Sequence, residues 1–263
     1  MLRIICLASA ILLAVHCGQT RPAEPELLVS VPLIPDGETN TYRVVIAGDS
    51  IGTYTTTASH GRFKDIPAYE VVLVARTRTG DVTAVDSSVI YVSRDSMVPL
   101  SSFRFIKTGG AMVTTAANYG PDMIAISAFS QGEETQRMLP AAPATFDADQ
   151  LTFLGRALQV SPERPQQITI VSPMGPPPGG RLRNGEFRAK GDENIVVPAG
   201  TFECYRYELE VDGSIIDLWY DRAGARKLVR YHSAEAGMSM ELLPAAPDSG
   251  GPARARDEEL SGE

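Results

Sequence analysis

The feature that most constrains the fold of this chain is a repeated pattern of β-branched and aromatic residues interrupted by short turns of glycine and aspartate. Two such pairs come early in the chain: residues 42–46 and 51–57 around Gly48-Asp49-Ser50, and residues 69–77 and 82–93 around Thr79-Gly80-Asp81. An extended run, a turn of this kind and a second extended run are typical of a β-hairpin. The pattern therefore predicts consecutive antiparallel hairpins.

The same pattern continues to the end of the chain, with one break. Further strands are predicted at residues 102–107, 111–115, 201–211, 214–220, 227–232 and 238–243. Residues 149–158 instead carry leucines at helical spacing, and Asp147 or Asp149 would cap this predicted helix. Strands that are apolar on both faces, as at residues 215–219, indicate either a covered second face or an apolar concave side. We therefore expect a mainly β fold, a single antiparallel and strongly curved sheet or half-barrel with one short helix.

Composition limits the partners and the number of domains. The 263 residues are 43% hydrophobic and 21% charged, which is ordinary for a globular protein. The net charge of −8 argues against nucleic-acid binding, which needs a concentrated basic face. We expect four segments: a signal peptide (1–16), a tether (17–40), an antiparallel β domain (41–243) and a disordered acidic tail (244–263).

The N-terminus reads as an export signal. Arg3 precedes an apolar run at residues 4–15, which is too short to cross a bilayer as a helix, since that takes roughly 20 residues. The run ends in Leu12-Leu13-Ala14-Val15-His16-Cys17, which resembles the bacterial lipobox and makes Cys17 the predicted lipid anchor. His16 departs from that motif, and the alternative is an incidental cysteine near a conventional cleavage site. An Asp directly after the anchor cysteine retains some lipoproteins at the inner membrane. Because this position is Gly18, we expect the anchor to lie in the periplasmic face of the outer membrane.

Residues 48–52 are the strongest catalytic candidate. Gly48-Asp49-Ser50-Ile51-Gly52 fits G-x-S-x-G and resembles the Gly-Asp-Ser block of a family of esterases and lipases. Such a serine needs a strand-to-helix junction, yet residues 53–58 are β-branched, and the late Asp-x-x-His of that family is missing. The alternative is a hairpin turn in which Gly48 supplies the positive φ.

The sequence contains no motif for metal binding or for a cysteine nucleophile. His60, His232 and Cys204 match no metal-ligand spacing, and Cys204 reads as a small core residue. We therefore predict no catalytic residue, no metal and no cofactor.

Several segments carry a family resemblance. Residues 197–205 (VPAGTFECY), Leu218-Trp219-Tyr220, Leu228-Val229-Arg230-Tyr231 and Tyr42-Arg43-Val44 resemble the bacterial cell-envelope family "domain of unknown function 3108". The resemblance covers residues 41–243. It implies an exported half-barrel similar to the lipoprotein carriers and receptors of the outer-membrane localisation pathway, without agreed catalytic residues.

These observations favour a lipid-anchored envelope protein whose curved sheet binds an apolar ligand or an envelope partner without catalysis. Candidate lining residues are Tyr42, Val44, Ile46, Phe103, Phe105, Ile216, Leu218 and Trp219, and the alternative for each is a place in the core. Two other functions stay open. One is an assembly scaffold that uses sheet edges or the Pro-rich segment 172–180, and the other is an esterase centred on Ser50.

Overall fold

The computed structural model describes residues 29–31, 33–174 and 180–245. The predicted signal peptide, the predicted anchor Cys17, the middle of the Pro-rich segment and most of the predicted acidic tail lie outside the described residues.

One sheet of 15 strands makes up the fold, in the spatial order β8-β7-β6-β5-β4-β3-β2-β1-β15-β14-β13-β12-β11-β10-β9. The strands are β1 (Glu38–Ile46), β2 (Asp49–Phe63), β3 (Ile66–Thr79), β4 (Val82–Ser93), β5 (Pro99–Thr108), β6 (Ala111–Tyr119), β7 (Met123–Ser130), β8 (Glu133–Pro140), β9 (Thr145–Asp147), β10 (Gln166–Ser172), β11 (Arg181–Val197), β12 (Gly200–Val211), β13 (Ser214–Asp221), β14 (Leu228–Ser233) and β15 (Met238–Leu242). The helical segments are a 3₁₀ turn, η1 (Ala148–Gln150), and the short helix α1 (Leu151–Leu154). Among the described residues, no helix is long and apolar enough to span a membrane.

The predicted curved antiparallel sheet is confirmed. Each strand pairs antiparallel with its neighbours except β9, which lies parallel to β10. Pairing of β1 with β15 joins the run β2–β8 to the run β9–β14. Because β8 and β9 are the two edges of a linear order, the sheet is a half-barrel that hydrogen bonds do not close.

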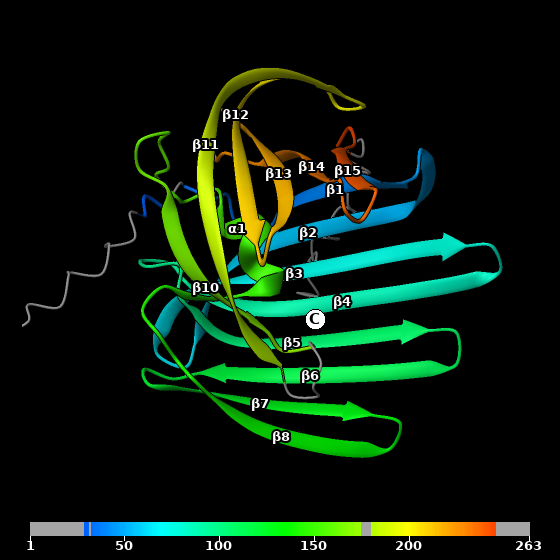
Figure 1. Ribbon diagram of the computed structural model, residues 1–263, viewed down its shortest axis with the longest axis vertical. Coiled ribbons are helices and arrows are strands. Elements are labelled where there is room, and N and C mark those ends of the chain that lie inside the picture. Colours follow the sequence, from blue (N-terminus) through cyan, green and yellow to red (C-terminus); the bar gives the residue numbers. More distant parts are fainter. Residues whose placement is uncertain (1–28, 32, 175–179, 246–263) are drawn as a thin grey trace, which may run out of the picture.

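The sheet bends until its two halves cross each other. Strands β2–β8 run side by side, β10–β13 run steeply across them, and α1 lies between the two halves (Figure 1). A small cluster of buried apolar side chains brings Val171 of β10 against Ala117, Ile124, Ile126 and Leu139 of β6–β8. The two ends of the sheet therefore pack through side chains without pairing their backbones.

The Gly48-Asp49-Ser50 segment is a hairpin connection, as the turn interpretation expected. Ala47 and Gly48 have φ values of 51° and 92°, the left-handed pair that a two-residue hairpin turn requires. Asp49 and Ser50 already belong to β2. Ser50 thus lies on a strand that follows a turn, and not at a strand-to-helix junction.

The predicted helix over residues 149–158 is mostly wrong, because α1 has only four residues. After Leu154 the backbone tightens, and Ala157 N–H donates to Leu154 O instead of continuing the α-helical pattern. Leu158 instead forms an isolated β-bridge with Val29. Leu154 and Leu158 are both fully buried, so the periodic pattern identified core residues correctly but not their local conformation.

Candidate functional site

The registers define an inner and an outer face of the sheet, because directly opposed residues on paired strands point to the same side. Tyr42 faces Tyr54, Tyr54 faces Ala75, Ala75 faces Asp86, and Asp86 faces Ile106. This row lies on the concave side that α1 fills, and we call it the inner face.

Five of the eight predicted lining residues lie on the inner face. Tyr42, Val44 and Leu218 are 2%, 4% and 1% exposed, so they belong to the core and line no open hollow. Ile46 is 38% exposed and Ile216 is half-buried. Only these two retain surface that a ligand in the concavity would reach.

The other three predicted lining residues lie on the outer face. Phe103 and Phe105 alternate with the inward residues Ser102, Arg104 and Ile106, and Phe103 is 48% exposed. The sequence alone could not show which residues of β5 point inward, because both faces of the strand carry bulky side chains. The structure therefore does not bring the eight residues together into one lining.

Trp219 has a different role on the outer face. Its ring lies between the guanidiniums of Arg206 and Arg230, 5.4 and 5.3 Å from the ring centroid. Its indole N–H donates to the Glu193 carboxylate at 2.8 Å. A tryptophan held between two cations is a rigid cross-strand contact and is only 6% exposed.

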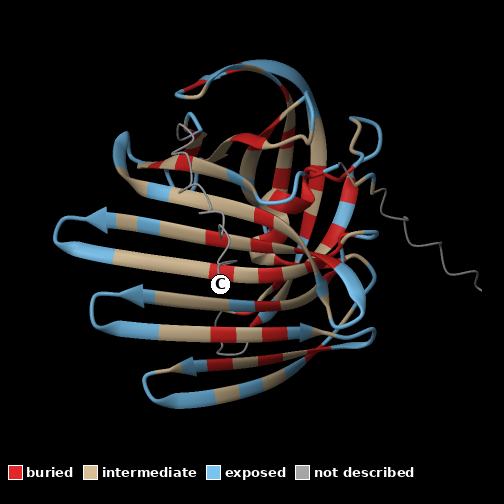
Figure 2. Cartoon of the chain, turned by 180° about the vertical axis from the view of Figure 1, so that it is seen from behind, coloured by how far each residue is buried: buried red, intermediate tan, exposed pale blue. Residues whose placement is uncertain are grey.

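The segment η1–α1 plugs the middle of the concavity. Phe153 packs edge-on against Tyr69 of β3, with ring centroids 5.7 Å apart, and Tyr220 of β13 donates its hydroxyl to Thr152 O. Buried residues gather around this plug, whereas the ends of β2–β8 that project away from it are exposed (Figure 2). The plug therefore links the two halves of the sheet and leaves one end of the concavity uncovered.

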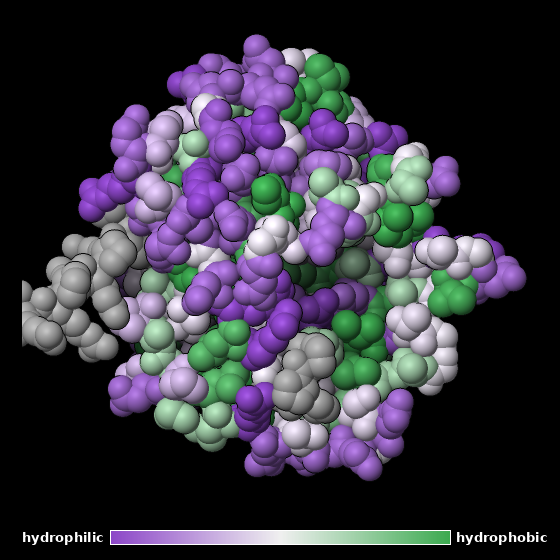
Figure 3. All heavy atoms as spheres, viewed as in Figure 1, coloured by the Kyte–Doolittle hydropathy of each residue, from purple (hydrophilic) through white to green (hydrophobic). Residues whose placement is uncertain are grey.

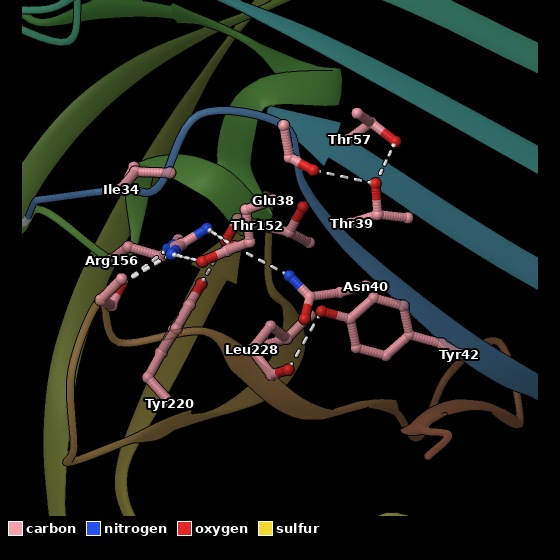
Figure 4. A network of polar contacts seen from close by, with 12 residues as sticks. Ile34, Glu38, Thr39, Asn40, Tyr42, Thr57, Thr152, Arg156, Tyr220 and Leu228 are labelled. Atoms are coloured by element: carbon pink, nitrogen blue, oxygen red, sulfur yellow. Dashed lines mark hydrogen bonds and ion pairs between the residues drawn. The ribbon is translucent and has the colours of Figure 1, made fainter. Parts of the chain in front are cut away.

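A buried ion pair holds the chain next to the plug (Figure 4). Arg156, 4% exposed, donates to both carboxylate oxygens of Glu38 and to Ala225 O. Tyr42 donates to Leu228 O at 3.0 Å, and burial raises the pKa of Tyr42 above its usual value. The cavity beside these residues has a volume of only about 20 Å³, so the interior is packed here.

A second polar cluster anchors the other side of the plug. Asp149 accepts hydrogen bonds from Arg104 at 2.8 Å and from Ser88 at 2.6 Å, and Arg104 also forms an ion pair with Asp86. Burial, reinforced by the carboxylate of Asp147, raises the pKa of Asp149 to about 6. The sequence predicts Asp147 and Asp149 as possible helix caps and does not identify their contacts with the sheet.

Asp147 completes this cluster. It is 1% exposed and accepts hydrogen bonds from Tyr119 and from the Asp149 backbone N–H. The second of these contacts is the predicted capping interaction. Burial raises the pKa of Asp147 and also that of Tyr119. The described residues hold no group of three or more His, Cys, Asp or Glu side chains arranged for a metal ion.

Apolar inner-face side chains remain partly exposed beyond the plug. We call them the inner stripe: Ile46, Ile106, Val113, Ile216 and Met238. They include two cross-strand pairs, Ile46 opposite Met238 and Ile106 opposite Val113. In the space-filling view, hydrophobic surface borders a hollow between the β12–β13 hairpin and β4–β6 (Figure 3). At the floor, Asp86 and Arg104 are 30% and 27% exposed. Ile106 of the stripe thus lies directly opposite a member of this ion pair, Asp86.

The remaining nucleophile and base candidates are separated. His60 contacts Ile34 O through Nε2, and His232 Nδ1 lies 2.9 Å from Ser239 Oγ. Within the described part of the chain, neither histidine forms a hydrogen bond with Ser50. Cys204 is buried, and burial raises the pKa of its thiol to about 12, which keeps it protonated near neutral pH.

Comparisons with known proteins identify a family, and one solved structure supports the β-barrel-like fold. The profile of the family described as "Protein of unknown function (DUF3108)" matches residues 41–239. A crystal structure of a β-barrel-like protein of domain of unknown function DUF1849 from Brucella abortus superposes with a TM-score of 0.53 at 11% identity, covering 82% of this chain and 98% of that one. A Bacteroides fragilis protein with a YmcC-like fold gives a TM-score of 0.29 at 12% identity, covering 83% and 98%. No curated protein matches the sequence.

Proposed function

The chain belongs to the DUF3108 family, and from that premise we propose that it is an exported, lipid-anchored envelope protein that binds an apolar ligand, without catalysis, on the inner stripe. The observation that carries the proposal is the partial exposure of apolar inner-face residues at the one end of the concavity that the plug leaves uncovered. Burying such surface under a ligand gains about 25 cal/mol for each Å² removed from water. Apolar walls with a few polar groups are the usual composition of a ligand site.

The test uses one inner and one outer residue of the same strand. We expect the neutral fluorophore N-phenyl-1-naphthylamine to bind the full-length protein, and Ile106→Ser to weaken binding about tenfold, since burying one such side chain is worth about 1.5–3 kcal/mol. Phe103→Ser is the matched control, because Phe103 lies three residues away on the outer face. Fluorescence titration measures both. Equal loss in both variants, or no binding by the wild type, contradicts the proposal.

A scaffold function is the second candidate, and the outer face favours it. Phe103, Met112, Phe129 and Met138 of β5–β8 are 48%, 47%, 39% and 55% exposed, and all four are apolar side chains on the outer face. Two results together would favour the scaffold. A photo-crosslinking residue in place of Phe129 would capture one envelope protein in cells, and the fluorophore would not bind the purified protein. The esterase alternative has no comparable support, because Ser50 lies on a hairpin strand and, among the described residues, forms no hydrogen bond with a histidine that could act as its base.

A further inference from the structure

A second cleft lies apart from the inner stripe, where the β11–β12 connection overhangs β1 and β15. A backbone hydrogen bond holds the overhang against β15, because Ala199 N–H donates to Leu242 O at 3.0 Å. Beneath it, Leu243 N–H donates to Thr41 O of β1 at 2.8 Å. Figure 1 shows this hairpin arching over the end of the sheet. The cleft has a volume of about 520 Å³, within the range usual for small-molecule sites. Its lining residues are Thr39, Asn40, Thr41, Ala199, Phe202, Lys227, Leu242, Leu243, Pro244 and Ala245.

Lys227 is the only charged side chain in this lining. Its ammonium lies 5.2 Å from the centroid of the Phe202 ring, and it forms no ion pair with any residue that the structure describes. Nearby carboxylates have other partners: Glu203 pairs with Arg222, and Asp221 accepts a hydrogen bond from the Ala223 backbone N–H. The lining of the cleft therefore carries one positive charge that is not part of an ion pair among the described residues.

The rest of the lining divides into an apolar and a polar part. Phe202 and Leu243 provide aromatic and aliphatic surface, whereas Thr39, Asn40 and Thr41 of β1 provide hydroxyl and amide groups. A lysine ammonium attracts a carboxylate or phosphate as a compact point charge. Apolar surface beside that charge favours a ligand with a hydrocarbon portion.

We propose that this Lys227 cleft binds the anionic head of a soluble amphiphile, a carboxylate or a phosphate monoester, with the start of its alkyl chain against Phe202 and Leu243. The inference goes beyond the proposed function, since the inner stripe takes a neutral apolar molecule and lies on the inner face of the sheet.

The test measures binding of decanoate and decyl phosphate to the full chain by isothermal titration calorimetry, below their critical micelle concentrations. We expect at least one of them to bind, and Lys227→Gln to weaken that binding tenfold or more. Lys227→Arg keeps the charge and should stay within about threefold of the wild type. The preferred ligand identifies the head group as carboxylate or phosphate.

Lys64 supplies a matched control. Its ammonium also lies over a phenylalanine, 5.4 Å from the Phe63 centroid, but at the β2–β3 turn and away from the cleft. Lys64→Gln should leave decanoate and decyl phosphate binding unchanged. An equal loss in both lysine variants would show a non-specific charge effect and overturn the proposal.

A comparison on the wild type does not depend on any variant folding. Decanol has the same chain without the charge, so it should bind the wild type at least tenfold more weakly than decanoate. Equal binding of decanol and decanoate, or loss of decanoate binding in Ile106→Ser but not in Lys227→Gln, would overturn the inference. The second outcome would place the anion on the inner stripe.

Discussion

Asp149 shows how a single residue ties the plug to the wall of the sheet. Its carboxylate accepts from Arg104 of β5 and Ser88 of β4, while Asp147 and Asp86 add negative charge nearby. Burial disfavours the ionised form, and this is why the pKa of Asp149 is raised to about 6. Titration of this group should therefore affect stability.

The sign of this effect follows from proton linkage. A folded-state pKa above the unfolded value of about 3.9 means that the folded chain binds more protons between about pH 4 and 6. The stabilisation from Asp149 is thus complete below about pH 4 and is lost as the pH rises through 6. We expect the free energy of unfolding to gain up to about 2 kcal/mol from this group on going from pH 7 to pH 4.5. Urea denaturation of wild type and Asp149→Asn at both pH values measures it, and parallel pH profiles would contradict it.

Asp147 and Asp149 also show which contacts can be predicted from the sequence and which cannot. Capping by Asp147 was predictable, because a cap depends on neighbours two residues away. The partnership of Asp149 with Arg104 was not, since it spans 45 residues and depends on where η1 docks against β5. The same limit applies to Lys227 and Phe202, which only the packing of β12 beside the start of β14 brings together.

At the scale of elements, hairpins with strong turn residues were predictable and polar strands were not. The β12–β13 pair around Asp212-Gly213 is confirmed by its register, from Val211 opposite Ser214 to Cys204 opposite Asp221. Five strands, β7 to β11, were missed, and two of them are largely polar: β8 (EETQRMLP) and β11 (RLRNGEFRAKGDENIVV). Edge strand β8 is largely exposed, and the polar middle of β11 leaves little apolar alternation to detect. Backbone pairing with the adjacent strands β7 and β12 decides their conformation, and their polar side chains give no apolar pattern that would reveal this pairing.

Gly155, the residue that follows α1, packs directly against Tyr220, and this close contact supports a prediction. A Cβ built on Gly155 would lie 2.1 Å from the hydroxyl oxygen of Tyr220, whose ring is fully buried. Gly155→Ala should therefore displace Tyr220 or α1 and cost about 1–3 kcal/mol of unfolding free energy. Gly61→Ala is the control, because its Cβ would meet nothing within 4 Å. Chemical denaturation compares the two. Equal stability of the two variants would show that the plug moves without cost.

For the whole molecule, the curved sheet, the plug and the pairing of β1 with β15 form one domain whose N-terminal strand begins at Glu38. The β-bridge between Val29 and Leu158 already ties the chain to the domain nine residues earlier. Eleven residues separate Cys17 from Val29, and eleven residues extend at most about 40 Å. An acyl anchor on Cys17 would therefore keep Val29, and with it the domain, tethered within about 40 Å of the membrane surface.

This geometry makes the anchor the decisive prediction for the whole molecule. We expect the mature wild type to begin at an acylated Cys17 and to partition with membranes, since several acyl chains at about 0.8 kcal/mol per buried methylene give stable attachment. Cys17→Ser should move the protein to the soluble periplasmic fraction. Because Cys17 lies before the domain, the variant should keep the wild-type thermal unfolding midpoint and its affinity for N-phenyl-1-naphthylamine. Fractionation with intact-mass spectrometry checks both forms. An unmodified mature N-terminus, or a Cys17→Ser variant that still sediments with membranes, would show that the protein works without a lipid anchor.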